Sequence, residues 1–250
     1  MVYNNKMTFG KLFVVGVPIG NFEDMPPRSL SYIKIAKNVV AESPNSFIRM
    51  CEILNIDHLQ KNIISIHFDS DGTKPGKMNE LENMTKIIEI LKSGEDVYLV
   101  ADEGMPGIAD PGSNIVKECI KNNIKISSTP GPSVVIAAAV ATGVMHNFIL
   151  ESFLPFTRQD KKLFLNNKKN HEYPMIIMLR NEKSETEFNN EIPEFLEDAS
   201  LILGENKQAS LCYNLTYPEE LVIHGSIKEL FEYFLSNKRN IKDKICIVIH

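Results

Sequence analysis

With 250 residues and a mass of 28.3 kDa, the chain has room for one large or two medium-sized domains. Its hydrophobic fraction of 43% and charged fraction of 24% are those of an ordinary folded protein and argue against a disordered, collagen-like or solenoid chain. The formal net charge of -5 argues against a surface that is basic throughout, so a nucleic-acid partner would need a local basic patch.

The four cysteines lie far apart and form no Cys-x-x-Cys pair, so we expect neither a disulfide framework nor a zinc site and take a reducing cytoplasm as the compartment. The six histidines show no metal-ligand spacing, and we expect no metal. The longest apolar run, residues 134–145, is shorter than the roughly 18 residues of a membrane span. The polar, Asn-rich start has no secretion-signal pattern.

The first half of the chain alternates apolar, β-branched segments with segments of helical periodicity. The expected strands are residues 11–17, 38–41, 63–68, 97–101 and 124–128. The expected helices are residues 26–37, 46–54, 81–94 and 113–122, with a turn-rich break at 72–76. This alternation predicts parallel βαβ units with helices on both faces of the sheet.

After Ala141 the regular alternation of strand and helix patterns ends, and the apolar segments become irregularly spaced. The strand candidates are residues 149–153, 175–179, 201–204, 221–223 and 245–249, the last of which is expected to be central or tied into the sheet. We predict a second α/β domain, with an N-terminal domain at 1–128 and a C-terminal domain at 129–250.

Three loops follow expected strands, at residues 17–21, 102–112 and 129–133. In an open parallel sheet, ligands bind outside the carboxyl ends of the strands, so the three loops should converge on one ligand site. Besides the residues named below, Gly20, Pro106 and Asp110 are candidate contacts in these loops.

The composition of the loops indicates the kind of ligand. The first loop lacks a Gly-x-Gly-x-x-Gly spacing, and Pro18 removes an N–H that a phosphate cradle would use, which disfavours a dinucleotide. The second loop combines three glycines with three carboxylates and suits a cationic or hydroxylated ligand. Taken singly, the loops have plainer interpretations as a turn, a long crossover and a helix N-cap at Ser133.

These loops and the segment Glu151-Ser152-Phe153-Leu154-Pro155 come in the order and spacing of the tetrapyrrole methylase superfamily, which the sequence resembles from about Lys11 onward. It is most similar to the ribosomal branch. The resemblance implies a two-domain α/β enzyme, usually a homodimer, that binds S-adenosylmethionine in the cleft between its domains. Ribosomal members methylate a cytidine 2′-hydroxyl of 16S rRNA, and other members methylate carbons of tetrapyrroles.

Carried over by position, the resemblance places a set of residues on the methyl donor. They are Pro18, Asp102, Glu103, Gly104, Ile108, Ser133 and Val134, with Met178 and Leu179 from the second domain. The donor carries a sulfonium, an amino group and ribose hydroxyls, which pair well with carboxylates and backbone carbonyls.

The chain departs from the ribosomal pattern at three motifs. Where the branch has Ala-Glu-Asp-Thr-Arg, this chain has Ala41-Glu42-Ser43-Pro44-Asn45. Residues 179–184 replace the glutamate of Tyr-Glu-Ser-x-His-Arg with a cation, and residues 212–217 keep only the Leu and Thr of Ala-Arg-Glu-Leu-Thr-Lys. His224-Gly225 falls where the family places a basic residue and a glycine. The donor loops are therefore retained while the acceptor-side motifs have changed.

Two features bear on the acceptor. Glu42 follows the second strand on the loop-bearing edge and is the candidate base for a hydroxyl acceptor, or else a helix-capping or solvated carboxylate. The segment 158–169 supplies a local basic patch that either contacts RNA phosphates or is a solvated helix face. Its cations are Arg158, Lys161, Lys162, Lys168 and Lys169.

We therefore predict an S-adenosylmethionine-dependent methyltransferase that acts in the cytoplasm on 16S rRNA or the small ribosomal subunit. A tetrapyrrole C-methyltransferase and a catalytically weakened RNA-binding relative remain the alternatives. A serine hydrolase is disfavoured because no Gly-x-Ser-x-Gly setting is present.

Overall fold

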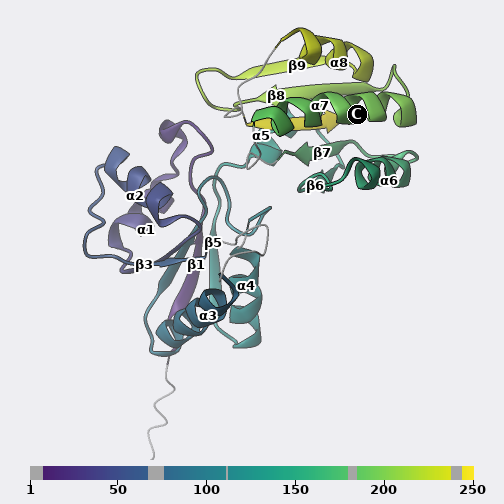
Figure 1. Ribbon diagram of the computed structural model, residues 1–250. Coiled ribbons are helices and arrows are strands. Elements are labelled where there is room, and N and C mark those ends of the chain that lie inside the picture. The colour runs from purple at the N-terminus through teal and green to yellow at the C-terminus, as the bar shows by residue number, and fades with distance from the viewer. Residues whose placement is uncertain (1–7, 67–75, 111, 180–184, 238–243) are drawn as a thin grey trace, which may run out of the picture. The chain divides into compact units, whose positions relative to one another are not determined.

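The computed structural model describes residues 8–66, 76–110, 112–179, 185–237 and 244–250, so the turn expected at 72–76 lies almost wholly outside the described residues (Figure 1). The chain divides into two compact units, residues 1–133 and 134–250, each built on its own five-stranded sheet. The division falls slightly later than the predicted boundary at 128/129, which would remove the last residue of a strand of the first sheet.

The first unit contains a wholly parallel sheet. Its strands are β1 (Lys11–Val15), β2 (Asn38–Ala41), β3 (Asn62–Ser65), β4 (Val97–Val100) and β5 (Lys125–Thr129). Their spatial order is β3-β2-β4-β1-β5, and each neighbouring pair is parallel. The strands follow the predicted positions closely, and all their carboxyl ends lie at one edge of the sheet.

Helices cover both faces of this sheet, which confirms the predicted α/β fold (Figure 1). They are α1 (Pro27–Ile35), α2 (Pro44–Ile53), α3 (Gly76–Lys92) and α4 (Gly112–Lys121), with a short 3-10 helix η1 (Phe22–Asp24) before α1. Ile33 and Phe47 from α1 and α2 pack with Tyr98 on one face, whereas Ile115 from α4 packs with Leu99 on the other. Strand β4 is buried on both faces, as its unbroken apolar sequence requires.

The second unit has a mixed sheet. Its strands are β6 (Ile149–Glu151), β7 (Met175–Met178), β8 (Gln208–Tyr213), β9 (Leu221–Ser226) and β10 (Ile245–Ile249), in the order β6-β7-β10-β8-β9. Only β6 and β7 are parallel, and the other neighbouring pairs are antiparallel. The expectation that the final strand is central is confirmed, because β10 lies between β7 and β8 and all five of its residues are buried.

One strand prediction for this unit was wrong, and one strand was not predicted. Residues 201–204 are not a strand, because residues up to Leu203 complete the long helix α7 (Glu185–Leu203), which ends at Gly204 with φ +104°. Strand β8 was not predicted because its residues that face α7 and α8 alternate with Ser210 and Cys212, whose small side chains weaken the apolar pattern.

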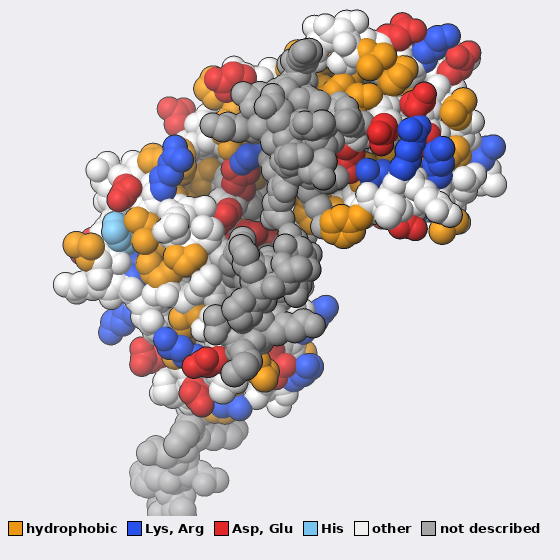
Figure 2. Space-filling model, in the orientation of Figure 1, with side chains coloured by type: hydrophobic (Ala, Val, Ile, Leu, Met, Phe, Trp, Pro, Cys, Tyr) orange, Lys and Arg blue, Asp and Glu red, His pale blue; other side chains and the backbone are white. Residues whose placement is uncertain are grey.

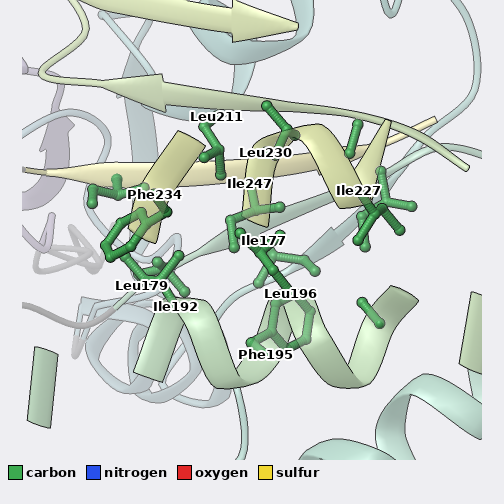
Figure 3. Packing of buried hydrophobic residues seen from close by; sticks show 14 of the residues in the cluster. Ile177, Leu179, Ile192, Phe195, Leu196, Leu211, Ile227, Leu230, Phe234 and Ile247 are labelled. Atoms are coloured by element: carbon green, nitrogen blue, oxygen red, sulfur yellow. The ribbon is translucent and has the colours of Figure 1, made fainter. Parts of the chain in front are cut away.

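Helices again cover both faces of the second sheet. They are α5 (Val134–Ala141), α6 (Arg158–Lys168), α7 and α8 (Ile227–Ser236). In Figure 3, Phe195 of α7 and Leu230 of α8 point toward Ile177 of β7 and Ile247 of β10. All four side chains are nearly or wholly buried. Helix α5 packs on the opposite face. No helix in the described ranges is long and apolar enough to cross a bilayer.

Candidate functional site

The three predicted ligand loops converge at the carboxyl edge of the first sheet. Their strands are neighbours, in the order β4-β1-β5. The N–H of Val17 donates to the carbonyl of Gly104 at 2.9 Å, and the N–H of Gly104 donates back to Pro18 at 3.3 Å. The N–H of Gly16 donates to Thr129 at 3.4 Å, at the end of β5. The first loop is thus hydrogen-bonded to the strand or loop on each side.

Glycines allow these loops to approach so closely. A Cβ on Gly16 would lie 2.7 Å from the Cα of Gly131, and a Cβ on Gly131 would meet the Cα of Gly16 at the same distance. Gly104 is buried at φ +73°, and a Cβ there would lie 3.2 Å from Cγ2 of Ile19. The site is therefore lined by backbone. Gly16 was not predicted as part of the site, although a glycine directly after a buried strand is a signal for such an approach.

Asp102 ties the end of β4 to the start of α2. Its Oδ1 accepts a hydrogen bond from the N–H of Ser43 at 3.0 Å, and its Oδ2 accepts one from Oγ of Ser46 at 3.0 Å. Ser43 is the N-cap of α2, where a carboxylate is favoured by the helix dipole. Both Asp102 oxygens therefore contact the helix start, and neither serine was identified from the sequence, although Ser43-Pro44 is a typical N-cap followed by N1 proline.

Glu42 belongs to the same connection. Its Oε2 accepts a hydrogen bond from the N–H of Asp102 at 3.2 Å, so residue 102 uses its side chain and its main chain to hold residues 42–46. Glu42 is half-buried and lies on the loop-bearing edge, and the helix cap is Ser43 instead. The arrangement fixes the orientation of the Glu42 carboxylate.

Asp110 shapes its own loop. Its Oδ1 accepts hydrogen bonds from the N–H groups of Gly107 at 2.7 Å and Gly112 at 2.8 Å. Burial raises the pKa of Asp110, although these hydrogen bonds oppose the shift. Ala109 between them has φ +61°, so the carboxylate stabilises a backbone turn that an alanine adopts at a cost. That Asp110 contacts the methyl donor stays a prediction.

The other predicted donor contacts divide between the two units. Those at the edge of the first sheet are Pro18, Gly20, Glu103, Pro106, Ile108 and Ser133. Of these, Glu103 and Ile108 are exposed, and Pro18 and Pro106 are buried. Val134 begins α5, and Met178 and Leu179 end or follow β7, so all three belong to the second unit. Their place on the donor stays a prediction.

The predicted basic patch is largely paired with acidic side chains of α7. Arg158 bonds to Asp198 through Nε at 2.8 Å and to Glu197 through Nη2 at 2.6 Å. Lys162 lies 3.3 Å from Asp198 as well. Hydrogen bonding from Arg158 lowers the pKa of Asp198, which keeps that buried carboxylate ionised.

Two further cations of the segment are also engaged. Lys161 is 5% exposed and pairs with the equally buried Glu191 at 2.6 Å, and Lys168 pairs with Glu151. Among the described residues only Lys169 of the five has no ion pair. Figure 2 shows basic side chains of the second unit beside acidic ones. The segment therefore offers much less charge to a polyanion than its sequence suggests, and Lys161 cannot reach a phosphate in this conformation.

The changed acceptor-side motifs lie only partly within the described residues. Residues 180–184 fall outside them, whereas Cys212 and Tyr213 are buried in β8 and His224 is exposed on β9. Within the described residues, no three His, Cys, Asp or Glu side chains gather as metal ligands would.

A parallel α/β unit with backbone-lined loops, followed by a mixed α/β unit, is the architecture of a known class of enzymes. Residues 11–230 match the model of the tetrapyrrole (corrin/porphyrin) methylases, and the chain belongs to this family of methyltransferases. Within it, the chain is similar over nearly its whole length to proteins named ribosomal RNA small subunit methyltransferase I.

Three of these relatives show the extent of the similarity. The Hydrogenobaculum protein is 30% identical over 243 residues, which cover 96% of this chain and 95% of the relative. The Thermotoga maritima protein is 29% identical over 230 residues, covering 92% and 94%. The Bacillus subtilis protein is 29% identical over 250 residues, covering 100% of this chain and 78% of the relative.

Solved structures of low identity share the fold. The methyltransferase CobJ matches with a TM-score of 0.65 at 14% identity, covering 96% of this chain and 93% of its own. A diphthine synthase matches with a TM-score of 0.65 at 18% identity, covering 96% and 90%. Together with the family match, they confirm the predicted fold class.

The buried pair of Lys161 and Glu191 yields a stability prediction. Lys161→Met should lower the free energy of unfolding by about 3–5 kcal/mol, because it leaves the Glu191 carboxylate buried without its cation. The double variant Lys161→Met/Glu191→Leu should recover most of the loss. Urea unfolding measures both, with Lys169→Met as the exposed control, expected to change stability by less than about 0.5 kcal/mol. Equal losses in the single and double variants would contradict the prediction.

Proposed function

We propose that the protein transfers the methyl group of S-adenosylmethionine to a cytidine 2′-hydroxyl of 16S rRNA in the small ribosomal subunit. The observation that carries the proposal is the hydrogen-bonded junction of the loops after β1, β4 and β5, in a chain whose relatives are named as rRNA small subunit methyltransferases. Such an acceptor assigns the protein to the cytoplasm, which suits four buried free cysteines.

The loop junction fits the methyl donor chemically. It offers an exposed Glu103 carboxylate next to the closely packed backbone of Gly104, and a carboxylate suits amino, hydroxyl and sulfonium groups. The residues that would hold the donor in this unit are Pro18, Gly104, Ile108 and Ser133. When bound, the donor supplies a methyl group already activated for in-line displacement, so the protein's contribution is orientation.

Glu42 would take the proton of the acceptor hydroxyl. The N–H of Asp102 holds one oxygen of its carboxylate, and Ser43 and Ser46 hold Asp102 in turn. A base held in this way can stay beside the acceptor hydroxyl while the hydroxyl oxygen would bond to the methyl carbon, the S–C bond of the donor would break to leave a neutral thioether, and the hydroxyl proton would move to the carboxylate.

The donor site can be tested with two glycines of equal backbone strain. Gly104 and Gly143 both have φ +73°, but a Cβ on Gly104 meets Ile19 and Pro132, whereas a Cβ on Gly143 has no neighbour within 4 Å. Gly104→Ala should weaken S-adenosylmethionine binding at least about tenfold, while Gly143→Ala should leave it unchanged. Isothermal titration measures both. Equal affinities in the two variants, or no binding of the donor by the parent, would refute the site.

The acceptor can be tested by offering labelled donor with small-subunit particles, naked 16S rRNA and uroporphyrinogen in parallel. We expect label only in 16S rRNA, at a cytidine 2′-oxygen. Glu42→Gln should lower kcat by about 10²–10⁴ and leave the donor affinity unchanged, because it removes the base and retains the side-chain shape. Label in the porphyrinogen would favour the tetrapyrrole alternative, and binding of rRNA without any label would favour the weakened relative.

We also propose that the active form is a homodimer, with the outer face of α5 in the interface. Helix α5 is apolar throughout, and next to its buried Val135 and Ala138 it exposes Ile136 and Val140, which are 55% and 63% exposed. Val140→Glu should therefore shift the protein toward the monomer in sedimentation equilibrium, with Leu201→Glu on α7, which is 77% exposed, as the control. A parent that sediments as a monomer would refute this assignment.

A further inference from the structure

A buried serine of the second unit joins two histidines. Ser210 on β8 is wholly buried, and its Oγ lies 2.9 Å from Nδ1 of His224 and 3.0 Å from Nε2 of His250. His224 stands opposite Ser210 on β9, and His250 directly follows β10, which pairs with β8 on its other side. The pairing of three strands thus holds both rings in place.

Counting hydrogen bonds limits the charge of this cluster. A hydroxyl donates one hydrogen bond and accepts two. With both rings neutral, or with one of them protonated, one ring nitrogen donates to Oγ and Oγ donates to the other ring, so every polar atom at the contact is satisfied. With both rings protonated, the hydroxyl proton of a wholly buried serine has no acceptor and two cations share one oxygen. The hydrogen bonds of the cluster therefore accommodate one added proton but not two.

The surroundings add positive charge. Lys207, directly before β8, is exposed and has no ion pair among the described residues. Burial first, and then the charges of His224 and Lys207, lower the pKa of His250. On β9 and α8, the carboxylate of Glu229 is engaged by the N–H and Oγ of Ser226.

Among the described residues, the side chains that share this face of the sheet with Ser210 are mostly apolar. Helix α5, which packs on this face of the sheet, has no titratable side chain. Of the two thiols on this face, burial raises the pKa of Cys212 to about 12 and that of Cys246 further, so both are neutral where histidines titrate. This contrasts with α6, where four of five cations already have carboxylate partners.

We propose that His224 and His250, linked through Ser210, form together with the nearby Lys207 an anion site that binds a backbone phosphate of the RNA acceptor and takes up a proton on binding. The inference rests on the proposed function, because the RNA substrate is what brings a phosphate to this surface. Exposed imidazolium and ammonium groups pair well with a phosphate, and an imidazolium beside a neutral ring remains fully hydrogen-bonded through Ser210.

The test compares RNA affinity across pH in matched variants, using fluorescence anisotropy of a labelled oligoribonucleotide and filter binding of small-subunit particles. The parent should bind about five- to tenfold more tightly at about pH 6 than at about pH 8, because the protonated histidine form binds the anion. His224→Gln should lose most of this pH dependence. His224→Lys should keep the tighter binding at both values, since lysine stays charged. His146→Gln, at an exposed histidine of the same unit, should behave as the parent.

A second readout does not depend on RNA chemistry. Titration with inorganic phosphate should shift the imidazole C2 proton of His224 in the NMR spectrum of the parent, and Ser210→Ala should weaken that shift, with circular dichroism confirming that each variant is folded. Identical pH profiles in the parent and His224→Gln would overturn the site, and so would a His224 resonance that shifts with neither RNA nor phosphate. If the parent still methylates small-subunit RNA in that case, the proposed function stands. A parent that neither binds nor methylates small-subunit RNA would overturn both.

Discussion

The close contact between the backbones of Gly16 and Gly131 is the constraint on which the candidate donor site depends. It draws the loops after β1 and β5 together with no side chain between them, and the Val17–Gly104 hydrogen bond adds the loop after β4. Only a parallel sheet with these three strands adjacent sets three carboxyl ends side by side, so the strand order and the glycines act as one requirement. Any Cβ at either glycine would force a backbone apart.

The changed motif at residues 41–45 is best understood through hydrogen bonds. Ser43 caps α2, and Asp102 from the neighbouring strand end accepts hydrogen bonds from both Ser43 and Ser46. Besides Glu42 of the motif, a second carboxylate is therefore present at this helix start, because the fold brings Asp102 there from the end of β4. A change in a family's sequence motif therefore does not by itself show that the carboxylate and hydrogen bonds at that place are lost.

Much of the first unit could be predicted because its signals are local. Each strand is a short β-branched run, each helix has its own apolar period, and the strand-helix alternation predicts parallel βαβ units, although not the order of the strands. The second unit was harder, since Leu201 to Leu203 have strand-like residues at the end of a helix and β8 carries Ser210 within its core pattern. Local sequence patterns cannot predict contacts between residues that are far apart in the chain. Arg158, for example, is hydrogen-bonded to Asp198, forty positions later, so the sequence of residues 158–169 alone does not show that its cations are paired with carboxylates.

The central place of β10 also governs how the second unit is assembled during synthesis. Strands β6 and β7 form one pair and β8 and β9 another, and only β10 joins them. Until residues 245–249 have left the ribosome, the unit consists of two strand pairs, each with an unpaired edge that is prone to association with other chains. The first unit, whose strands all lie before residue 130, can fold well before that moment. The order of synthesis thus leaves the second sheet as two separate strand pairs until β10 is made, at a stage when the first sheet already has all its strands.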